Sequence, residues 1–164
     1  MRSRDRSLSH DTVEITSFQP GDGPLFKTLN EEWLRKYFVV EPLDEAVLGN
    51  PQGEIIDRGG FIFFIHLKGK VVGTVALIKV DERTFELSKM AVTASAQGRG
   101  LGKHLLEHAI AFAEGKGARK LVLYTSRKLH PALHLYHWHG FVEVPLDHSG
   151  YERAEVKMER MLGA

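Results

Sequence analysis

The segment Gln97-Gly98-Arg99-Gly100-Leu101-Gly102-Lys103 constrains this chain more than any other. Its three glycines lie between the apolar run Leu87–Val92 and the helix-like run Leu101–Ala113, which predicts a strand, a short loop and a helix N-terminus. The first N–H groups of a helix lack intrahelical partners, and the helix dipole favours negative charge there. Glycine allows close approach to the backbone, and Arg99 and Lys103 add positive charge. The segment is therefore suited to bind phosphate oxygens.

The segment does not match either of two familiar phosphate-binding loops. A dinucleotide-binding fingerprint needs a different glycine spacing and an acidic residue about twenty positions later, where this chain has Lys120–Leu123. A P-loop needs Ser or Thr after Gly-Lys, whereas His104 follows Gly102-Lys103. The pattern alone leaves open a glycine-rich turn without chemical consequence, with Arg99 and Lys103 on a solvated face.

Periodicity and turn residues predict the elements along the chain. Alternating or β-prone runs predict strands, apolar residues at helical spacing predict helices, and Lys68-Gly69-Lys70 predicts a hairpin turn. The predicted order is β-α-α-β-β-β-α-β-α-β-β, an α/β fold with a mixed sheet and helices on both faces. The predicted elements are strand Thr12–Phe18, helix Pro24–Phe38, helix Pro42–Leu48, strands Phe61–Leu67, Val71–Val80 and Phe85–Val92, helix 100–115, strand 119–125, helix Pro131–His139, and strands Phe141–Val144 and Ala154–Met161.

Composition narrows the class of protein. The 164 residues, 43% of them hydrophobic, are enough for one domain with its own core. A net charge of +1 gives no basic field for nucleic acid, and no apolar run is long enough to span a bilayer. Cysteine is absent, which excludes disulfides and thiol catalysis. We expect a disordered tail at 1–11, a single domain at 12–164 and a cytoplasmic location without a membrane partner.

Four motifs in sequence order resemble the GCN5-related N-acetyltransferases (GNAT), in particular small bacterial-type members. Gln97-x-x-Gly100-x-Gly102 resembles the family's Gln/Arg-x-x-Gly-x-Gly/Ala signature. Glu86–Val92 resembles the strand before it, and Leu121–Ser126 resembles the strand after it. Ala132-Leu-His-Leu-Tyr-His-Trp-His-Gly-Phe141 resembles the family's Ala-x-x-Leu-Tyr-x-x-x-Gly-Phe element. The likeness covers about Gly60 to Met161.

The resemblance implies a fold and a co-substrate. The sheet would be mostly antiparallel, with a central parallel pair of strands that splay apart and receive the pantetheine arm of acetyl-CoA. Met90, Ala91 and Val92 would pair with that arm through backbone groups. The segment Gln97, Gly98, Arg99, Gly100, Leu101, Gly102 and Lys103 would hold the pyrophosphate. His130 stands where many members have an asparagine that contacts pantetheine, so this contact is open, and Ser126 is an alternative.

The resemblance also implies catalytic roles. Transfer to an amine needs a base for the amine and an acid for the departing sulfur. Tyr136 matches the family's general acid, although it would also suit packing against Leu133 and Phe141. Glu86 matches a carboxylate that many members use as base. It could instead be a surface acid paired with Lys89 or Arg83, and Glu32, Glu41 or a histidine could then be the base.

The acceptor side is less defined. Candidate lining residues are Trp33, Tyr37, Phe38, Glu41, Tyr151 and Arg153, with ordinary core packing as the alternative for Trp33 and Phe38. Aromatic rings with a carboxylate suit a cationic amine. Nine histidines raise the question of a metal, including the pair His104 and His108. No Cys or carboxylate ligand accompanies them, so no metal is expected.

The sequence predicts an acetyl-CoA-dependent N-acetyltransferase that transfers the acetyl group directly, in a ternary complex, to a primary amine of a small molecule or peptide. A catalytically silent CoA-binding sensor or interaction module is the alternative from another class. Retention of both Glu86 and Tyr136 favours the enzyme. A protein N-acetyltransferase differs only in the acceptor, and a homodimer through the final strands is left open.

Overall fold

The computed structural model describes residues 12–147 and 150–163, so the tail predicted at 1–11 lies outside the described residues. One sheet of seven strands has the order β1-β2-β3-β4-β5-β7-β6. Within these described ranges only β4 and β5 run parallel, and every other neighbouring pair is antiparallel. The strands are β1 (Val13–Ser17), β2 (Phe61–Leu67), β3 (Lys70–Asp81), β4 (Thr84–Val92), β5 (Lys120–Thr125), β6 (Val142–Val144) and β7 (Val156–Met161).

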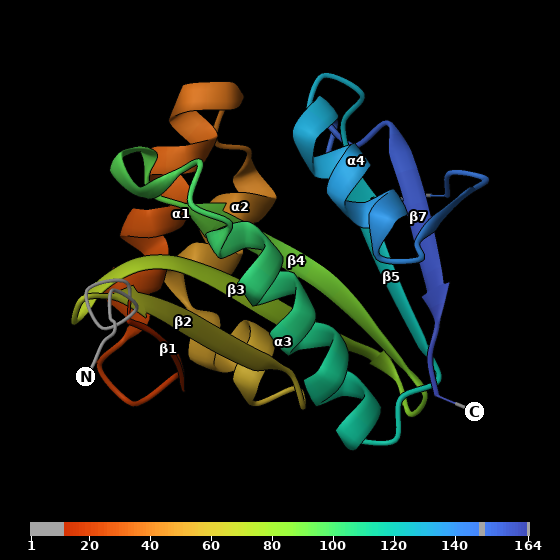
Figure 1. Cartoon of the computed structure of the whole chain (residues 1–164), viewed down its shortest axis with the longest axis horizontal. Helices are drawn as coiled ribbons and strands as arrows, with labels where there is room; N and C mark the ends of the chain where they lie inside the picture. The colour runs from red at the N-terminus through yellow and green to blue at the C-terminus, as the bar shows by residue number, and fades with distance from the viewer. Residues whose placement is uncertain (1–11, 148–149, 164) are drawn as a thin grey trace, which may run out of the picture.

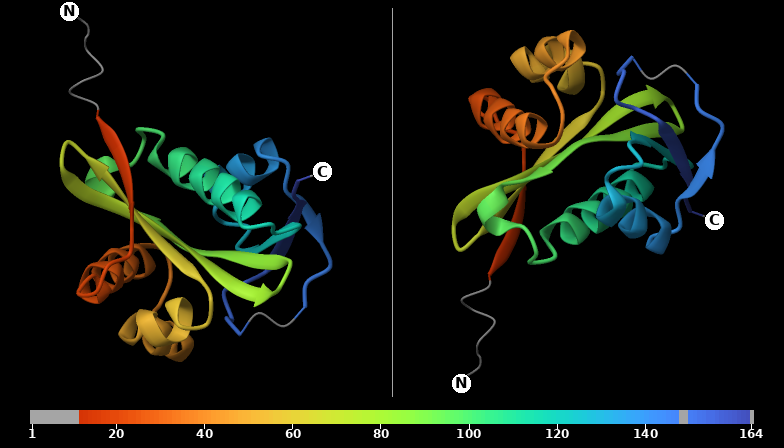
Figure 2. Two further views of the ribbon diagram at one scale, coloured as in Figure 1. Left: turned by 90° about the horizontal axis from the view of Figure 1, so that it is seen from below. Right: turned by 90° about the horizontal axis from the view of Figure 1, so that it is seen from above.

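In the described part of the chain, four α-helices cover the two faces of the sheet. Helices α1 (Gly23–Tyr37) and α2 (Pro42–Gly49) lie on one face, and α3 (Leu101–Gly115) and α4 (His130–Trp138) lie on the other (Figure 2). The predicted fold class and element order are thus confirmed, with boundary differences of a few residues at most. Two short turns were not predicted, a π-helical turn at Gln52–Ile56 and a 3-10 turn at Ala94–Ala96.

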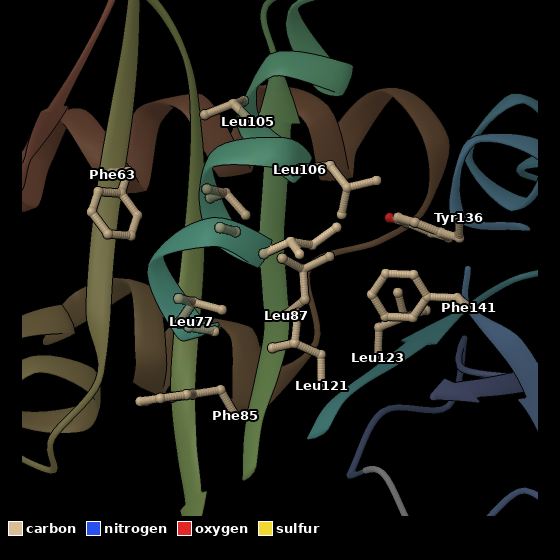
Figure 3. Packing of buried hydrophobic residues seen from close by; sticks show 14 of the residues in the cluster. Phe63, Leu77, Phe85, Leu87, Leu105, Leu106, Leu121, Leu123, Tyr136 and Phe141 are labelled. Carbon is tan, nitrogen blue, oxygen red and sulfur yellow. The ribbon is translucent and has the colours of Figure 1, made fainter. Parts of the chain in front are cut away.

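Each face has its own hydrophobic core. The α3 and α4 face buries one strip of the sheet with Leu105, Leu106 and Phe141, as Figure 3 shows. The opposite face packs against α1 and α2 around Phe26 and Phe64. Successive strand residues point to opposite faces, so β4 places Phe85 and Leu87 in the first core and turns Glu86 toward the side of α1 and α2.

The parallel pair at the centre of the sheet is short. It runs from Thr84 to Glu86 on β4 and from Lys120 to Val122 on β5. Beyond these residues β5 runs toward α4, whereas β4 runs away from it toward α2 (Figure 1). The divergence opens the middle of the sheet between its two helical layers, as the family resemblance implied.

Strand β4 contains a β-bulge just beyond its parallel segment. Ser88 pairs with Ala76 and Ala91 pairs with Thr74, so two residues of β4, Lys89 and Met90, stand opposite one residue of β3. Lys89 has φ 55°, a left-handed conformation that L-residues with side chains rarely adopt. Such a conformation costs on the order of 1 kcal/mol and persists only where the surroundings hold it.

Candidate active site

A cleft of about 740 Å³ lies where β4 and β5 diverge. Its walls come from β4, β5, the C-terminal half of α1, the glycine-rich loop, α4 and residues 151–154. The sequence-predicted residues that line it are Trp33, Tyr37, Phe38, Glu86, Met90, Ala91, Val92, Gln97, Gly98, Gly100, Leu101, Gly102, Ser126, Tyr136, Tyr151 and Arg153. The cleft therefore brings together most of the predicted catalytic and binding residues from both faces of the sheet.

The glycine-rich loop forms one end of the cleft. Gly98 and Gly100 have φ 83° and 76°, which favours glycine at both positions. A Cβ built at Gly98, Gly100 or Gly102 meets no atom within 4 Å, so the backbone is open to an approaching group. Helix α3 begins at Leu101, and its first N–H groups lie at this open end. This arrangement fits the diphosphate group that the sequence predicted.

The side chain of Gln97 fixes this loop to its surroundings. Its Nε2 donates to the carbonyl oxygen of Val92 at 3.0 Å, and its Oε1 accepts from the Tyr37 hydroxyl at 3.3 Å. The glutamine thus joins the end of β4 to the C-terminus of α1. Arg99 and Lys103 are exposed beside the loop and do not line the cleft.

Tyr136 reaches the cleft from α4. Its side chain is 8% exposed and its ring contacts Phe141 edge-on at 5.9 Å between centroids. Figure 3 shows the hydroxyl pointing from α4 toward Leu106 of α3. Burial raises the pKa of Tyr136 to about 12, so its hydroxyl keeps its proton at neutral pH. The packing against Phe141, which the sequence offered as the alternative to an acid role, is present, and the residue also lines the cleft.

Glu86 lies in the same cleft on the α1 and α2 side. It is half-buried, and burial raises its pKa to about 7 despite the opposing effect of the nearby Lys89 ammonium. A carboxylate with such a pKa can accept and release a proton near neutrality. Lys89 pairs with Asp44 instead of Glu86, contrary to the pairing that the sequence left open.

A buried network of ion pairs lies beside Glu86 and was not predicted from the sequence. Lys89 Nζ donates to Asp44 Oδ1 at 2.7 Å and to the Tyr151 hydroxyl at 2.9 Å. Both Arg153 Nη atoms donate to Asp44 at 2.7 Å, and Nη1 also donates to Glu41 Oε2 at 3.2 Å. These cations hold the pKa of Asp44 at about 2, against the effect of burial. The spacing of Glu41 and Asp44 suggests only a capping box for α2, which is also present.

Two of the acidic candidates are engaged elsewhere. Glu41, predicted to line the acceptor side, lies in the ion network and lines a smaller neighbouring groove of about 430 Å³. Glu32 accepts hydrogen bonds from the Thr93 hydroxyl and the Ala94 N–H. Among the described residues, Glu86 is the only carboxylate that lines the cleft. The alternatives Glu32 and Glu41 are thus placed away from the cleft because backbone and ion-pair partners hold them.

The two candidates for the pantetheine contact, His130 and Ser126, differ in their position relative to the cleft. His130 is the first residue of α4, is exposed and does not line the cleft. Ser126 is 5% exposed, lines the cleft and donates to Glu155 Oε1 at 3.0 Å. Of the two, Ser126 is the one whose side chain is within reach of a molecule in the cleft.

Tyr124 and Lys128 line the cleft and were not singled out from the sequence. The Tyr124 hydroxyl donates to Asp147 Oδ1 at 2.6 Å, and Lys157 donates to Oδ2 at 2.8 Å. Lys128 donates to the carbonyl oxygen of Tyr37 and lies 4.1 Å from the centre of the Phe38 ring. Neither Tyr124 nor Lys128 belongs to a sequence motif, so the sequence does not indicate that they line a site.

Within the described ranges, no three His, Cys, Asp or Glu side chains are grouped so that they could hold a metal ion. His134 and His137 are exposed, while His108 packs edge-on against Phe63 at 4.5 Å. No helix in the described part of the chain is long and apolar enough to cross a membrane.

Comparisons with known proteins show the family of the chain. A model of the acetyltransferase (GNAT) family matches residues 25–141. An uncharacterized N-acetyltransferase of Bacillus subtilis is 29% identical over 116 residues, which cover 69% of this chain and 75% of that protein. The chain spans about half the length of several other curated relatives that it matches.

Solved structures show the same fold. A GNAT acetyltransferase from Staphylococcus aureus aligns with a TM-score of 0.81 and 20% identity, covering 93% of this chain and all of that one. The PaiA N-acetyltransferase of Thermoplasma acidophilum, solved with coenzyme A, aligns with a TM-score of 0.71 and 19% identity over 92% of this chain and 99% of that one. The motifs, the splayed strands and the family match lead to one conclusion: the chain belongs to the GNAT family of acetyltransferases.

Proposed function

We propose that the protein is an acetyl-CoA-dependent N-acetyltransferase that transfers the acetyl group directly to a primary amine. One observation carries the proposal: Glu86, with a pKa of about 7, and Tyr136, with a pKa of about 12, line the same cleft from opposite sides of the sheet. A protein that only bound CoA would need neither group. The family match and the coenzyme A in the related Thermoplasma structure support the choice of co-substrate.

The residues at the splay fit the co-substrate. The open loop of Gly98 and Gly100 and the start of α3 would hold the diphosphate through backbone N–H groups. The bulge at Lys89 and Met90 would present backbone groups to the pantetheine arm and the acetyl carbonyl, because the pairing of β4 with β3 is interrupted there. When bound, acetyl-CoA supplies a thioester, whose acyl carbon is open to attack by an amine.

Glu86 performs the first proton transfer in this proposal. An alkyl ammonium with a pKa near 10 is almost entirely protonated at neutral pH and cannot attack until it loses a proton. Glu86 takes that proton, directly or through one water, and a backbone N–H of the bulge stabilises the negative charge that develops on the carbonyl oxygen.

Tyr136 performs the second proton transfer. As the carbon–sulfur bond breaks, its hydroxyl donates a proton to the departing sulfur, and the new amide bond remains on the acceptor. A neutral phenol suits this step because burial keeps the hydroxyl protonated. Tyr136 recovers its proton from solvent and Glu86 releases the one it took, so the protein returns to its starting state. The absence of cysteine supports direct transfer without an acyl-enzyme on a thiol.

The test measures CoA release from acetyl-CoA with a panel of primary amines and peptides. We expect amine-dependent release of free thiol together with an acetylated product of matching mass. The double variant Glu86→Gln/Tyr136→Phe should bind acetyl-CoA by calorimetry but lose turnover. Binding of acetyl-CoA without turnover for every amine and peptide would reject the enzyme and favour the CoA-binding sensor.

A further inference from the structure

The charges around the cleft restrict the acceptor. Among the described residues, the cleft is lined by a single carboxylate, Glu86, and by the cationic side chains Lys36, Lys89, Lys128 and Arg153. Glu86 is assigned to the reacting amine in the proposed function. A second positive charge on an acceptor would therefore meet cations and no further carboxylate on the cleft wall.

The interior cations are already neutralised. Arg153 is bound to Asp44 through two hydrogen bonds of 2.7 Å and to Glu41 at 3.2 Å. Lys89 is bound to Asp44 at 2.7 Å, and Asp44 is fully buried. An acceptor carboxylate would have to break one of these pairs to gain a buried cation, and an acceptor ammonium would have to break one to gain a buried carboxylate. Either exchange would leave a buried charge of the protein without its partner, which raises the free energy of the complex.

The outer charged groups differ from the interior ones. Lys36 is exposed and lies 5.1 Å from the centre of the Tyr37 ring. Lys128 donates to the carbonyl oxygen of Tyr37 and stacks on Phe38. Asp147, whose charge acts on Glu86, accepts from Tyr124 at 2.6 Å and from Lys157 at 2.8 Å. The charged groups nearest to Glu86 thus form pairs with one another.

The remaining wall of the cleft is largely uncharged and contains several aromatic side chains. Trp33 packs against Tyr37 and Phe38 with ring centroids 5.2 Å and 5.7 Å apart. Tyr124 and Tyr151 line the cleft from the other side. Aromatic walls gain free energy by covering uncharged aromatic or aliphatic groups.

We propose that the acceptor is a monoamine with an uncharged aromatic or aliphatic body, and that neither polyamines nor amino acids with a free carboxylate are preferred substrates. The inference rests on the proposed function and names its acceptor class. A wall with one carboxylate, whose buried cations are already paired, selects one ammonium and offers a second charge on the acceptor no buried partner. The exposed Lys36 and Lys128 could form only surface pairs, which contribute little free energy.

Matched pairs of acceptors test the proposal. Butylamine and 1,4-diaminobutane differ by a second cation, and L-phenylalaninamide and L-phenylalanine differ by a carboxylate. We expect kcat/KM to be at least about tenfold higher for the first member of each pair, since one unpaired charge costs more than 1.4 kcal/mol. 2-Phenylethylamine should exceed spermidine by a similar factor. Preference for 1,4-diaminobutane, spermidine or L-phenylalanine would overturn the proposal.

A change of charge in the protein gives an independent test. Arg153→Leu leaves Glu41 without its cation, so the ratio of kcat/KM for spermidine over 2-phenylethylamine should rise by about threefold or more. Arg153→Lys keeps the charge and should leave the ratio unchanged. If Arg153→Leu does not fold, Lys128→Gln removes an exposed cation from the cleft, and the ratio should rise about two- to fivefold. An unchanged ratio in the folded variants contradicts the proposal.

Failure of this inference is distinguishable from failure of the proposed function. Turnover of a polyamine or an amino acid in place of the neutral monoamines rejects the acceptor class and retains the transferase. Binding of acetyl-CoA without turnover of any amine rejects both.

Discussion

Lys89 Nζ lies 2.7 Å from Asp44 Oδ1, and the exposed fractions of these two side chains are 5% and 0%. The pair joins the bulge of β4 to α2, elements that are 45 residues apart. The ion pair and the Tyr151 hydroxyl hold Lys89 at φ 55°. Because the same bulge lines the cleft, a packing feature of α2 sets the backbone against which the co-substrate would lie.

Asp44→Ala should destabilise the protein by about 3–5 kcal/mol, because it leaves the charges of Lys89 and Arg153 buried without their shared partner. Urea denaturation at pH 7 measures the effect. Glu54→Ala is the control: it removes the pair with Arg58, whose side chain is 68% exposed, and should cost less than about 1 kcal/mol. Similar losses in the two variants would contradict the role given to the buried pair.

Glu86→Gln should stabilise the protein above pH 7. The pKa of Glu86 rises from an ordinary 4.5 to about 7 in the folded state. Below pH 4.5 both states are protonated and the residue has no effect. As pH rises from 4.5 to 7, the unfolded state ionises first, so the wild type loses stability. The penalty is complete above pH 7 and amounts to about 1–3 kcal/mol.

Denaturation of the wild type and Glu86→Gln at pH 4.5 and pH 8 checks this. The difference between the two proteins should be near zero at pH 4.5 and should favour the variant at pH 8. A constant difference at both pH values would show that Glu86 does not titrate in this range.

The pH dependence of turnover should also report the ionisation of Glu86. In the proposed mechanism Glu86 must be ionised, so kcat/KM should rise with pH through about 7. Lys89→Met removes the ammonium that favours ionised Glu86, and should move this rise to higher pH. Lys89→Arg, which keeps the charge, should move it less. If Lys89→Met lowered kcat/KM by the same factor at every pH, the lysine would act on structure alone.

Most of the fold could be predicted from the sequence, and the reasons are local. Turn residues such as Lys68-Gly69-Lys70 and the glycine after α4 set the boundaries of elements. The π-helical turn at Gln52–Ile56 was missed because it follows Pro51 and contains Gly53, residues that normally indicate a loop.

The site was predictable where a motif specified it and not where long-range charges did. Glu86, Tyr136 and the loop at Gln97 were found through their motifs and line one cleft. Asp44 carries no such pattern, since its partners Lys89 and Arg153 lie 45 and 109 residues away. Pairing across such separations depends on how α2 packs on the sheet, which periodicity does not report.

Gly100→Ala should weaken both stability and co-substrate binding. Gly100 has φ 76° at the N-terminus of α3, so alanine would be strained by about 1–2 kcal/mol. Relief of that strain would turn the first N–H groups of α3 away from the diphosphate. Gly102→Ala is the matched control, because Gly102 lies inside the helix without a positive φ, and a Cβ there meets nothing within 4 Å beyond the backbone of its own helix.

Thermal denaturation and calorimetry with CoA separate the two glycines. Gly100→Ala should lower both Tm and affinity. Gly102→Ala should keep or raise Tm, since alanine favours a helix over glycine. Any loss of CoA affinity in Gly102→Ala then reports contact with the ligand alone. Unchanged CoA affinity in both variants would place the diphosphate elsewhere.

Tyr136→Phe should lower kcat by about 10²-fold or more while changing CoA affinity by less than about threefold, because the hydroxyl acts on the departing sulfur and the ring supplies the packing. The Phe141 contact at 5.9 Å survives in the variant, so the fold should be retained.

Tyr124→Phe serves as the control: it removes another cleft hydroxyl, one that donates to Asp147. Its effect on kcat should be much smaller. Acceptors with amines of equal basicity keep the first proton transfer constant in this comparison. Equal losses of kcat in the two variants would remove Tyr136 from its role as the acid.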